Sequence, residues 1–138
     1  MQVEIDRAEL PGMLATLTSY ESLFGPYHQQ TLHLLAHIAV ACLQIGEAGY
    51  ARPLLERAIR DMGRYLSREH ELRIEAIEAL RTLLIAQQEY GRAALVHKEL
   101  LECQIQRLGG NHPETLATRA SLAAFLLERC PPESAVAA

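Results

Sequence analysis

Apolar residues recur at intervals of three and four positions along most of the chain, which is the period of an α-helix. Glycine, proline and polar residues interrupt this pattern in short stretches that are typical of turns. Because the connections are short, neighbouring helices are expected to run antiparallel. Two consecutive prolines cannot continue a helix, so residues 131–138 are expected to form a flexible tail. The pattern predicts an all-α protein with six helices, at residues 9–23, 29–45, 50–65, 71–87, 91–107 and 113–129.

The helical pattern itself repeats along the chain. His28, His70 and His112 are each 42 residues from the next, and a set of apolar positions keeps the same interval. A fixed period of this length is the signature of a repeat array. We interpret the unit as an antiparallel helical hairpin with a first helix A and a second helix B. A single domain at residues 1–130 then contains a half repeat at 9–23, repeats at 24–65 and 66–107, and a half repeat at 108–129.

Composition and charge limit the classes of function that the protein can have. The 138 residues are 49% hydrophobic and 22% charged, which is ordinary for a soluble folded chain. The formal net charge is −4 and no basic stripe is visible, so nucleic-acid binding has no electrostatic support. No segment approaches the roughly 20 apolar residues of a membrane helix, and the N-terminus does not resemble a signal peptide.

The three cysteines point to a reducing environment. Cys42, Cys103 and Cys130 are odd in number and show no C-x-x-C spacing, which argues against a disulfide framework or a zinc site. A cytoplasmic protein is therefore expected. Cys42 and Cys103 stand at apolar positions and are expected to behave as small buried hydrophobic residues, whereas Cys130 lies beside the tail.

Motifs at the repeat boundaries resemble a known family. Residues 108–116 read Leu-Gly-Gly-Asn-His-Pro-Glu-Thr-Leu, residues 24–32 differ from this pattern mainly by Gln for Pro, and residues 66–74 are a degenerate copy. Tyr-Gly-Arg-Ala at 90–93 matches the usual entry to a second helix, and residues 46–54 match it with one exception. Over about residues 9–129 the chain resembles the tetratricopeptide repeat in its longer, kinesin-light-chain-like form.

The resemblance implies an α-solenoid, a right-handed superhelix of hairpins, that acts as a protein-interaction module. In this family helix A lines a concave groove that holds a partner peptide. An asparagine on helix A often contacts the peptide backbone, but the corresponding positions here are His37, Ala79 and Ser121. The sequence therefore departs from the family at the positions that clamp the peptide.

The polar face of each A helix must point away from the core of its hairpin, so it supplies the candidate residues for a partner-binding groove. This face is mixed and mildly acidic, which favours a neutral to basic peptide as partner. The alternative is an ordinary solvated face. The candidate groove residues are Gln30, His33, His37, Gln44, Glu75, Ala79, Thr82, Glu114, Ser121 and Glu128.

Histidines invite a metal or catalytic interpretation. His33 and His37 are four residues apart on one helix, which is the spacing of a metal-ligand pair. No Glu lies between them in the manner of an H-E-x-x-H motif, so a groove or surface pair is the preferred interpretation. The repeated His28, His70 and His112 are expected to have a structural role at the turn that enters helix A. No catalytic motif is visible, and no cofactor, metal or enzymatic activity is expected.

The terminal helices suggest a second class of function. The array begins with a B-type helix and ends with an A-type helix that lacks its B partner, and repeat units at the ends of an array need caps. An uncovered apolar face of this kind marks an interaction surface. Self-assembly, most simply as a homodimer, is therefore the alternative to a peptide-binding adaptor, whether the chain is a whole protein or part of a longer array. The apolar residues concerned are Leu116, Leu122, Phe125 and Leu126.

Overall fold

The computed structural model describes residues 7–129, and this part of the chain is helical without any strand. The all-α prediction with six helices is confirmed, and each predicted helix boundary lies within two residues of the observed one. The predicted tail at 131–138 and Cys130 lie outside the described residues. The elements are η1 (Arg7–Glu9), α1 (Leu10–Phe24), α2 (Gln29–Gln44), α3 (Ala48–Tyr65), α4 (Glu71–Ala86), α5 (Tyr90–Leu108) and α6 (Pro113–Arg129).

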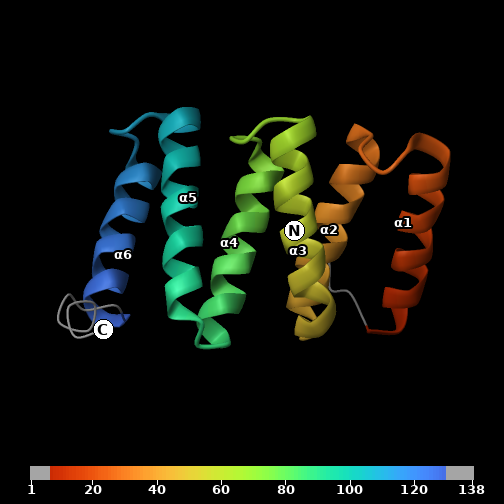
Figure 1. The fold of residues 1–138 in the computed structure, drawn as a ribbon, viewed down its shortest axis with the longest axis horizontal. Coiled ribbons are helices and arrows are strands. Elements are labelled where there is room, and N and C mark those ends of the chain that lie inside the picture. The colour runs from red at the N-terminus through yellow and green to blue at the C-terminus, as the bar shows by residue number, and fades with distance from the viewer. Residues whose placement is uncertain (1–6, 130–138) are drawn as a thin grey trace.

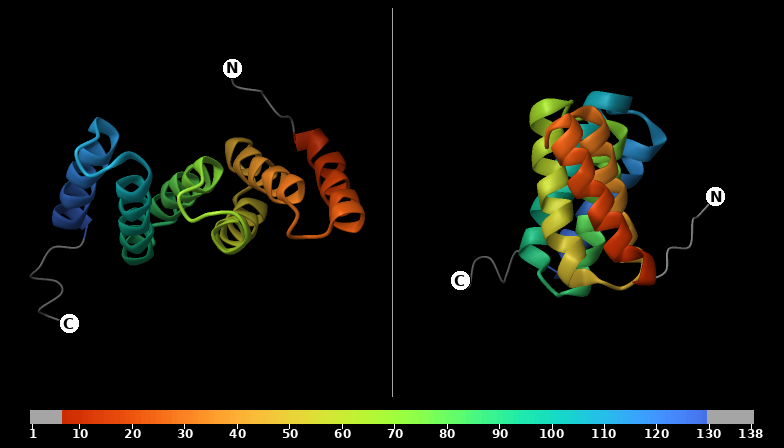
Figure 2. Two further views of the ribbon diagram at one scale, coloured as in Figure 1. Left: turned by 90° about the horizontal axis from the view of Figure 1, so that it is seen from above. Right: turned by 90° about the vertical axis from the view of Figure 1, so that its right-hand side faces the viewer.

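The helices stand side by side in chain order along the long axis of the molecule, and neighbours run antiparallel (Figure 1). Seen from above, α2, α4 and α6 lie on one side of the array, and α3 and α5 lie on the other (Figure 2). Each helix packs against the next, and α2 also packs directly against α4. The result is an elongated stack of helical hairpins in which α2 and α4 are A helices and α3 and α5 are their B partners.

The core lies between the two sides of the array and follows the repeat. Small residues at equivalent positions, Ala51 of α3 and Ala93 of α5, are completely buried near the start of each B helix. Small side chains at such places let two helices approach closely. Cys42 and Cys103 are buried as predicted, and burial raises the pKa of both thiols. The largest fully buried side chains include Leu32, Leu35, Ile38, Leu55, Met62, Ile77, Leu84 and Leu100.

The three repeated histidines cap the A helices. In each case Nδ1 accepts a hydrogen bond from the backbone N–H two residues later: Gln30 to His28 at 3.1 Å, Leu72 to His70 at 3.2 Å, and Glu114 to His112 at 3.1 Å. Such a bond satisfies one of the free N–H groups of the first helical turn. The predicted structural role is therefore confirmed, since each of the three histidines caps an A helix through Nδ1.

None of the helices in the described part of the chain combines the length and apolarity needed to cross a membrane.

Candidate functional site

The predicted groove residues lie on the A helices, on the side of the array formed by α2, α4 and α6 (Figure 2). Most are exposed, whereas His33 and Ala79 are partly buried. The structure brings four of them together in two hollows between α4, α5 and α6. The remaining candidates, Gln30, His33, His37, Gln44, Ala79 and Glu128, line neither hollow.

The first hollow has a volume of about 210 Å³ and lies toward the C-terminal end of α4. Thr82 and Ser121, two of the predicted groove residues, line it from α4 and α6. Its other walls come from Arg81 and Ile85 of α4, Phe125 of α6 and His97 of α5. Sequence reasoning missed His97, because the contribution of α5 depends on how the helices pack. The complete lining is Arg81, Thr82, Ile85, His97, Ser121 and Phe125.

A buried histidine and an arginine form the polar wall of the first hollow. His97 is 2% exposed, and its Nε2 lies 3.3 Å from Nη1 of Arg81. Because an arginine can only donate, Nε2 accepts this hydrogen bond and the ring is neutral. Burial lowers the pKa of His97, and the Arg81 charge lowers it further. The Phe125 ring, 6.3 Å from the His97 ring, adds an apolar wall. The first hollow is therefore apolar with a cationic edge.

The second hollow has a volume of about 220 Å³ and lies toward the N-terminal end of α4. Predicted groove residues Glu75 and Glu114 line it from α4 and α6. Its single cation, Arg107, is already engaged, since Nη2 lies 3.6 Å from Glu71 and Nη1 donates to the Glu69 carbonyl at 3.3 Å. The complete lining is Glu71, Ile74, Glu75, Glu78, Gln104, Arg107, Leu108 and Glu114.

Negative charge accumulates in this second hollow. Between residues 7 and 129, no cation lies within 4.0 Å of the carboxylates of Glu75, Glu78 or Glu114. Burial raises the pKa of the Glu78 carboxyl; Arg81 opposes this shift, and the charges of Glu75 and Glu114 add to it. The three carboxylates therefore repel one another, and a positive group would relieve the repulsion.

Gln104 adds an unsatisfied acceptor to the wall of the acidic hollow. The residue is 5% exposed, and its Oε1 is buried without a hydrogen-bond partner. Its backbone carbonyl, by contrast, accepts a hydrogen bond from the Thr115 hydroxyl at 3.5 Å. A buried acceptor that is left unpaired costs about 1–3 kcal/mol. Sequence reasoning missed Gln104, because a polar residue on a B helix carries no signal that it will be buried.

His33 pairs with His70 in addition to sharing a helix with His37. The His33 and His70 rings are 5.3 Å apart between centroids, and Nε2 of His33 is buried without a partner. Burial lowers the pKa of His33, and the neighbouring His70 and His37 lower it further. Within the described residues, no three His, Cys, Asp or Glu side chains are grouped so that they could hold a metal ion. His33 and His37 thus carry no metal-site geometry in this part of the chain.

The predicted oligomer surface on α6 divides into two parts. Leu116 and Leu126 are 46% and 39% exposed, and Leu127, which was not predicted, is 68% exposed. Leu122 and Phe125 are only partly buried, and Phe125 packs against the main core as well as lining the first hollow. Leu116, Leu126 and Leu127 are therefore open to a partner on α6, whereas Phe125 packs against the core and lines the first hollow.

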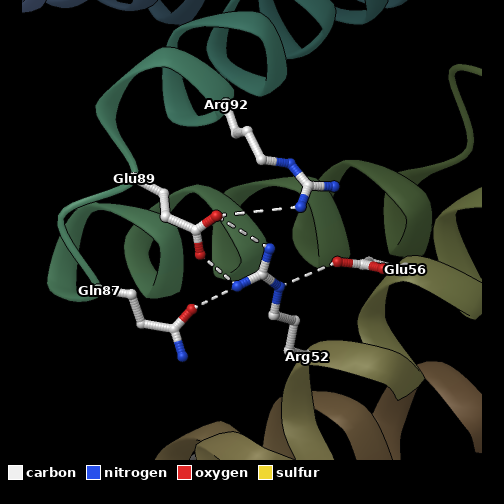
Figure 3. A network of polar contacts seen from close by, with 5 residues as sticks. All are labelled: Arg52, Glu56, Gln87, Glu89 and Arg92. Carbon is white, nitrogen blue, oxygen red and sulfur yellow. Dashed lines mark hydrogen bonds and ion pairs between the residues drawn. The ribbon is translucent and has the colours of Figure 1, made fainter.

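A polar network holds the α4–α5 turn against α3, at the same end of α4 as the first hollow (Figure 3). The Arg52 guanidinium donates to Gln87 at 2.8 Å, to Glu56 at 3.1 Å and to both carboxylate oxygens of Glu89. Arg92 lies 3.9 Å from the same Glu89 carboxylate. The hydrogen bond from Arg52 lowers the pKa of Glu89. The network links consecutive hairpins and so orients α4 relative to α3.

No protein-family model matches the chain, and no curated protein matches it. The geometry of the face formed by α4, α5 and α6 is therefore the basis for assigning a function.

Proposed function

We propose that this protein is an interaction module that holds a peptide segment of a partner protein along the face formed by α4 and α6. The observation that carries the proposal is the pair of hollows on this face, one apolar with a cationic edge and one acidic. Glu75 and Thr82 are seven residues apart on α4, which corresponds to about 10 Å along a helix. An extended segment of about three residues spans that distance.

The repeat architecture supports the same function. Stacked helical hairpins bury their apolar faces on their neighbours and leave a continuous surface for a partner. We infer that these hairpins are tetratricopeptide-like repeats, a proposal supported by the capping histidines and by the buried Ala51 and Ala93. Among the three positions where that family often has asparagine, Ser121 lines the first hollow. A hydroxyl there is one group able to hydrogen-bond a peptide backbone.

Selection of peptides from a phage-displayed random library tests the proposal. The wild-type protein should enrich a set of related sequences that bind in solution. Ser121→Arg should abolish their binding, because the long side chain fills the first hollow. Ala120→Arg adds the same charge at an exposed neighbouring position on α6 that lines neither hollow, so it should leave binding unchanged. Equal loss of binding in both variants would contradict the proposed site.

The second candidate function is self-assembly through α6, which is favoured by the exposure of Leu116, Leu126 and Leu127. Large apolar patches on a surface mark sites of association. Sedimentation velocity should then show a species larger than a monomer that dissociates in a Leu126→Glu, Leu127→Glu variant. A wild-type monomer at high micromolar concentration would rule this candidate out.

A further inference from the structure

The acidic hollow offers acceptors and almost no donors. Glu75 and Glu78 enter it from α4, Glu114 from α6, and Gln104 from α5. Arg107, the one cation in the lining, contacts Glu71 and the Glu69 carbonyl. Three carboxylates without an ion pair therefore surround a space that also holds a polar side chain from α5.

Two independent observations indicate that this space suits a positively charged donor. The first is the group of three carboxylates, Glu75, Glu78 and Glu114. Within residues 7–129 none of them has a cation within 4.0 Å. The second is Gln104, whose buried Oε1 has no hydrogen-bond partner. A buried acceptor that no protein donor pairs gains a hydrogen bond when a ligand brings a donor to it. An anion or an acidic side chain would meet only repulsion here.

A metal ion does not fit these observations as well as an organic cation. Divalent cations require several oxygen or nitrogen ligands that converge on one point. In residues 7–129 no three His, Cys, Asp or Glu side chains converge in this way. The carboxylates are spread around a hollow of about 220 Å³, which has room for an extended side chain.

We propose that the hollow lined by Glu75, Glu78, Gln104 and Glu114 binds a lysine or arginine side chain of the partner segment. This inference rests on the proposed peptide-binding function and specifies the partner chemistry at one end of the face. The ammonium or guanidinium group pairs with the carboxylates, and its N–H groups donate to the Gln104 amide oxygen when that side chain turns toward the hollow. The aliphatic part of the side chain lies against Ile74 and Leu108, which line the same hollow.

A basic side chain in this hollow also sets the spacing of the residues in the partner segment. The acidic hollow lies at the N-terminal end of α4 and the apolar hollow at its C-terminal end. A segment that places its basic residue beside Glu75 therefore places a residue about three positions away beside Thr82 and Ser121. Bound sequences should share a fixed spacing between a basic and an apolar residue.

The peptide selection described above separates this inference from the proposed function. Wild-type protein should enrich sequences with Lys or Arg at one fixed position. The Glu78→Gln, Glu114→Gln variant keeps the side-chain shapes but removes two charges, so it should lose that preference and bind the selected peptides roughly tenfold more weakly. Glu102→Gln removes one exposed charge on α5 outside the hollow and serves as the control for a general charge effect. Enrichment without a basic position, or with a preference that survives in the double variant, would overturn the inference and leave the function standing.

A second measurement applies even if no peptide is enriched. N-acetyl-arginine amide can be titrated into ¹⁵N-labelled protein while the side-chain amide of Gln104 is followed by NMR. The expected result is a saturable shift of that amide, weakened by added salt and reduced in the Glu78→Gln, Glu114→Gln variant. N-acetyl-glutamate should produce no such shift. Equal responses to the two probes, or no response of Gln104 to the arginine probe, would refute the site directly.

Discussion

The guanidinium of Arg73 occupies the space that a side chain at position 63 would fill. A Cβ atom added to Gly63 would lie only 2.8 Å from Nε of Arg73. Arg73 is 5% exposed and donates to the carbonyls of Ile59 and Arg68 and to the Glu99 carboxylate. A buried charge is tolerated when it is paired and hydrogen-bonded in this way.

The position of Arg73 is occupied by threonine in the other two units. Thr31 and Thr115 are fully buried and donate to the carbonyls of Tyr20 and Gln104 in the preceding helix. The position 42 residues from Gly63 in each direction carries a larger residue, Glu21 or Ile105. In the middle unit the A helix therefore carries the large Arg73 where the other units have threonine. The helix before it carries Gly63 where the equivalent helices have a larger residue.

We expect Gly63→Ala to destabilise the protein by about 1–3 kcal/mol, because the added methyl group forces Arg73 out of its hydrogen-bonded position. Urea denaturation measures the change. Gly49→Ala, in the same helix, meets no atom within 4 Å and should be neutral or stabilising by about 0.5–1 kcal/mol. If both alanine variants lose equal stability, the contact with Arg73 is not the cause.

A double-mutant cycle tests the coupling between the two positions. In an Arg73→Thr background, Gly63→Ala should cost about 1 kcal/mol less than in the wild type, because the clash has been removed. Chemical denaturation of the four proteins gives the interaction free energy. Additive effects would show that positions 63 and 73 do not interact.

Gln88→Gly should stabilise the protein. Gln88 has a left-handed backbone with φ of 62°, whereas the equivalent position one repeat earlier is Gly46, with φ of 80°. A residue with a Cβ atom pays roughly 1 kcal/mol for this conformation, and glycine does not. We expect a higher melting temperature for Gln88→Gly and a lower one for Gly46→Gln, measured by circular dichroism. A change of the same sign in both variants would contradict this explanation.

Acidification should destabilise the array. The pKa values of His33 and His97 are lowered in the folded protein, chiefly by burial, so the unfolded chain binds more protons as the pH falls. The stability from these neutral rings is present above the unfolded pKa of about 6.5 and is lost progressively below it. Melting temperatures between about pH 7.5 and pH 5 measure the effect. His97→Gln removes one of the two groups and should make the profile flatter, whereas an unchanged profile would exclude His97 as a contributor.

Loss of a capping histidine should weaken its helix. His112→Ala removes the acceptor for the Glu114 N–H and should cost about 0.5–2 kcal/mol, while His112→Asn retains a capping oxygen and should cost less. Hydrogen exchange of the first turn of α6 localises the change. Equal losses for alanine and asparagine would indicate that the capping hydrogen bond is not what stabilises this turn.

The sequence by itself determined the helices, their boundaries and the repeat. Apolar periodicity, glycines and prolines are local signals, and the histidine caps are local as well, since each bonds a backbone N–H two residues away. The A-helix pattern also singled out Glu75, Thr82, Glu114 and Ser121, which line the two hollows.

Only the tertiary structure decided which residues complete that face and which polar groups are buried. His97 and Gln104 are polar residues on a B helix, and their burial depends on how α6 packs against α5. Arg73 is buried because Gly63, ten residues earlier on another helix, leaves room for it. Periodicity specifies which face of a helix is covered, but the partners of a polar side chain depend on contacts between helices that a local pattern does not encode.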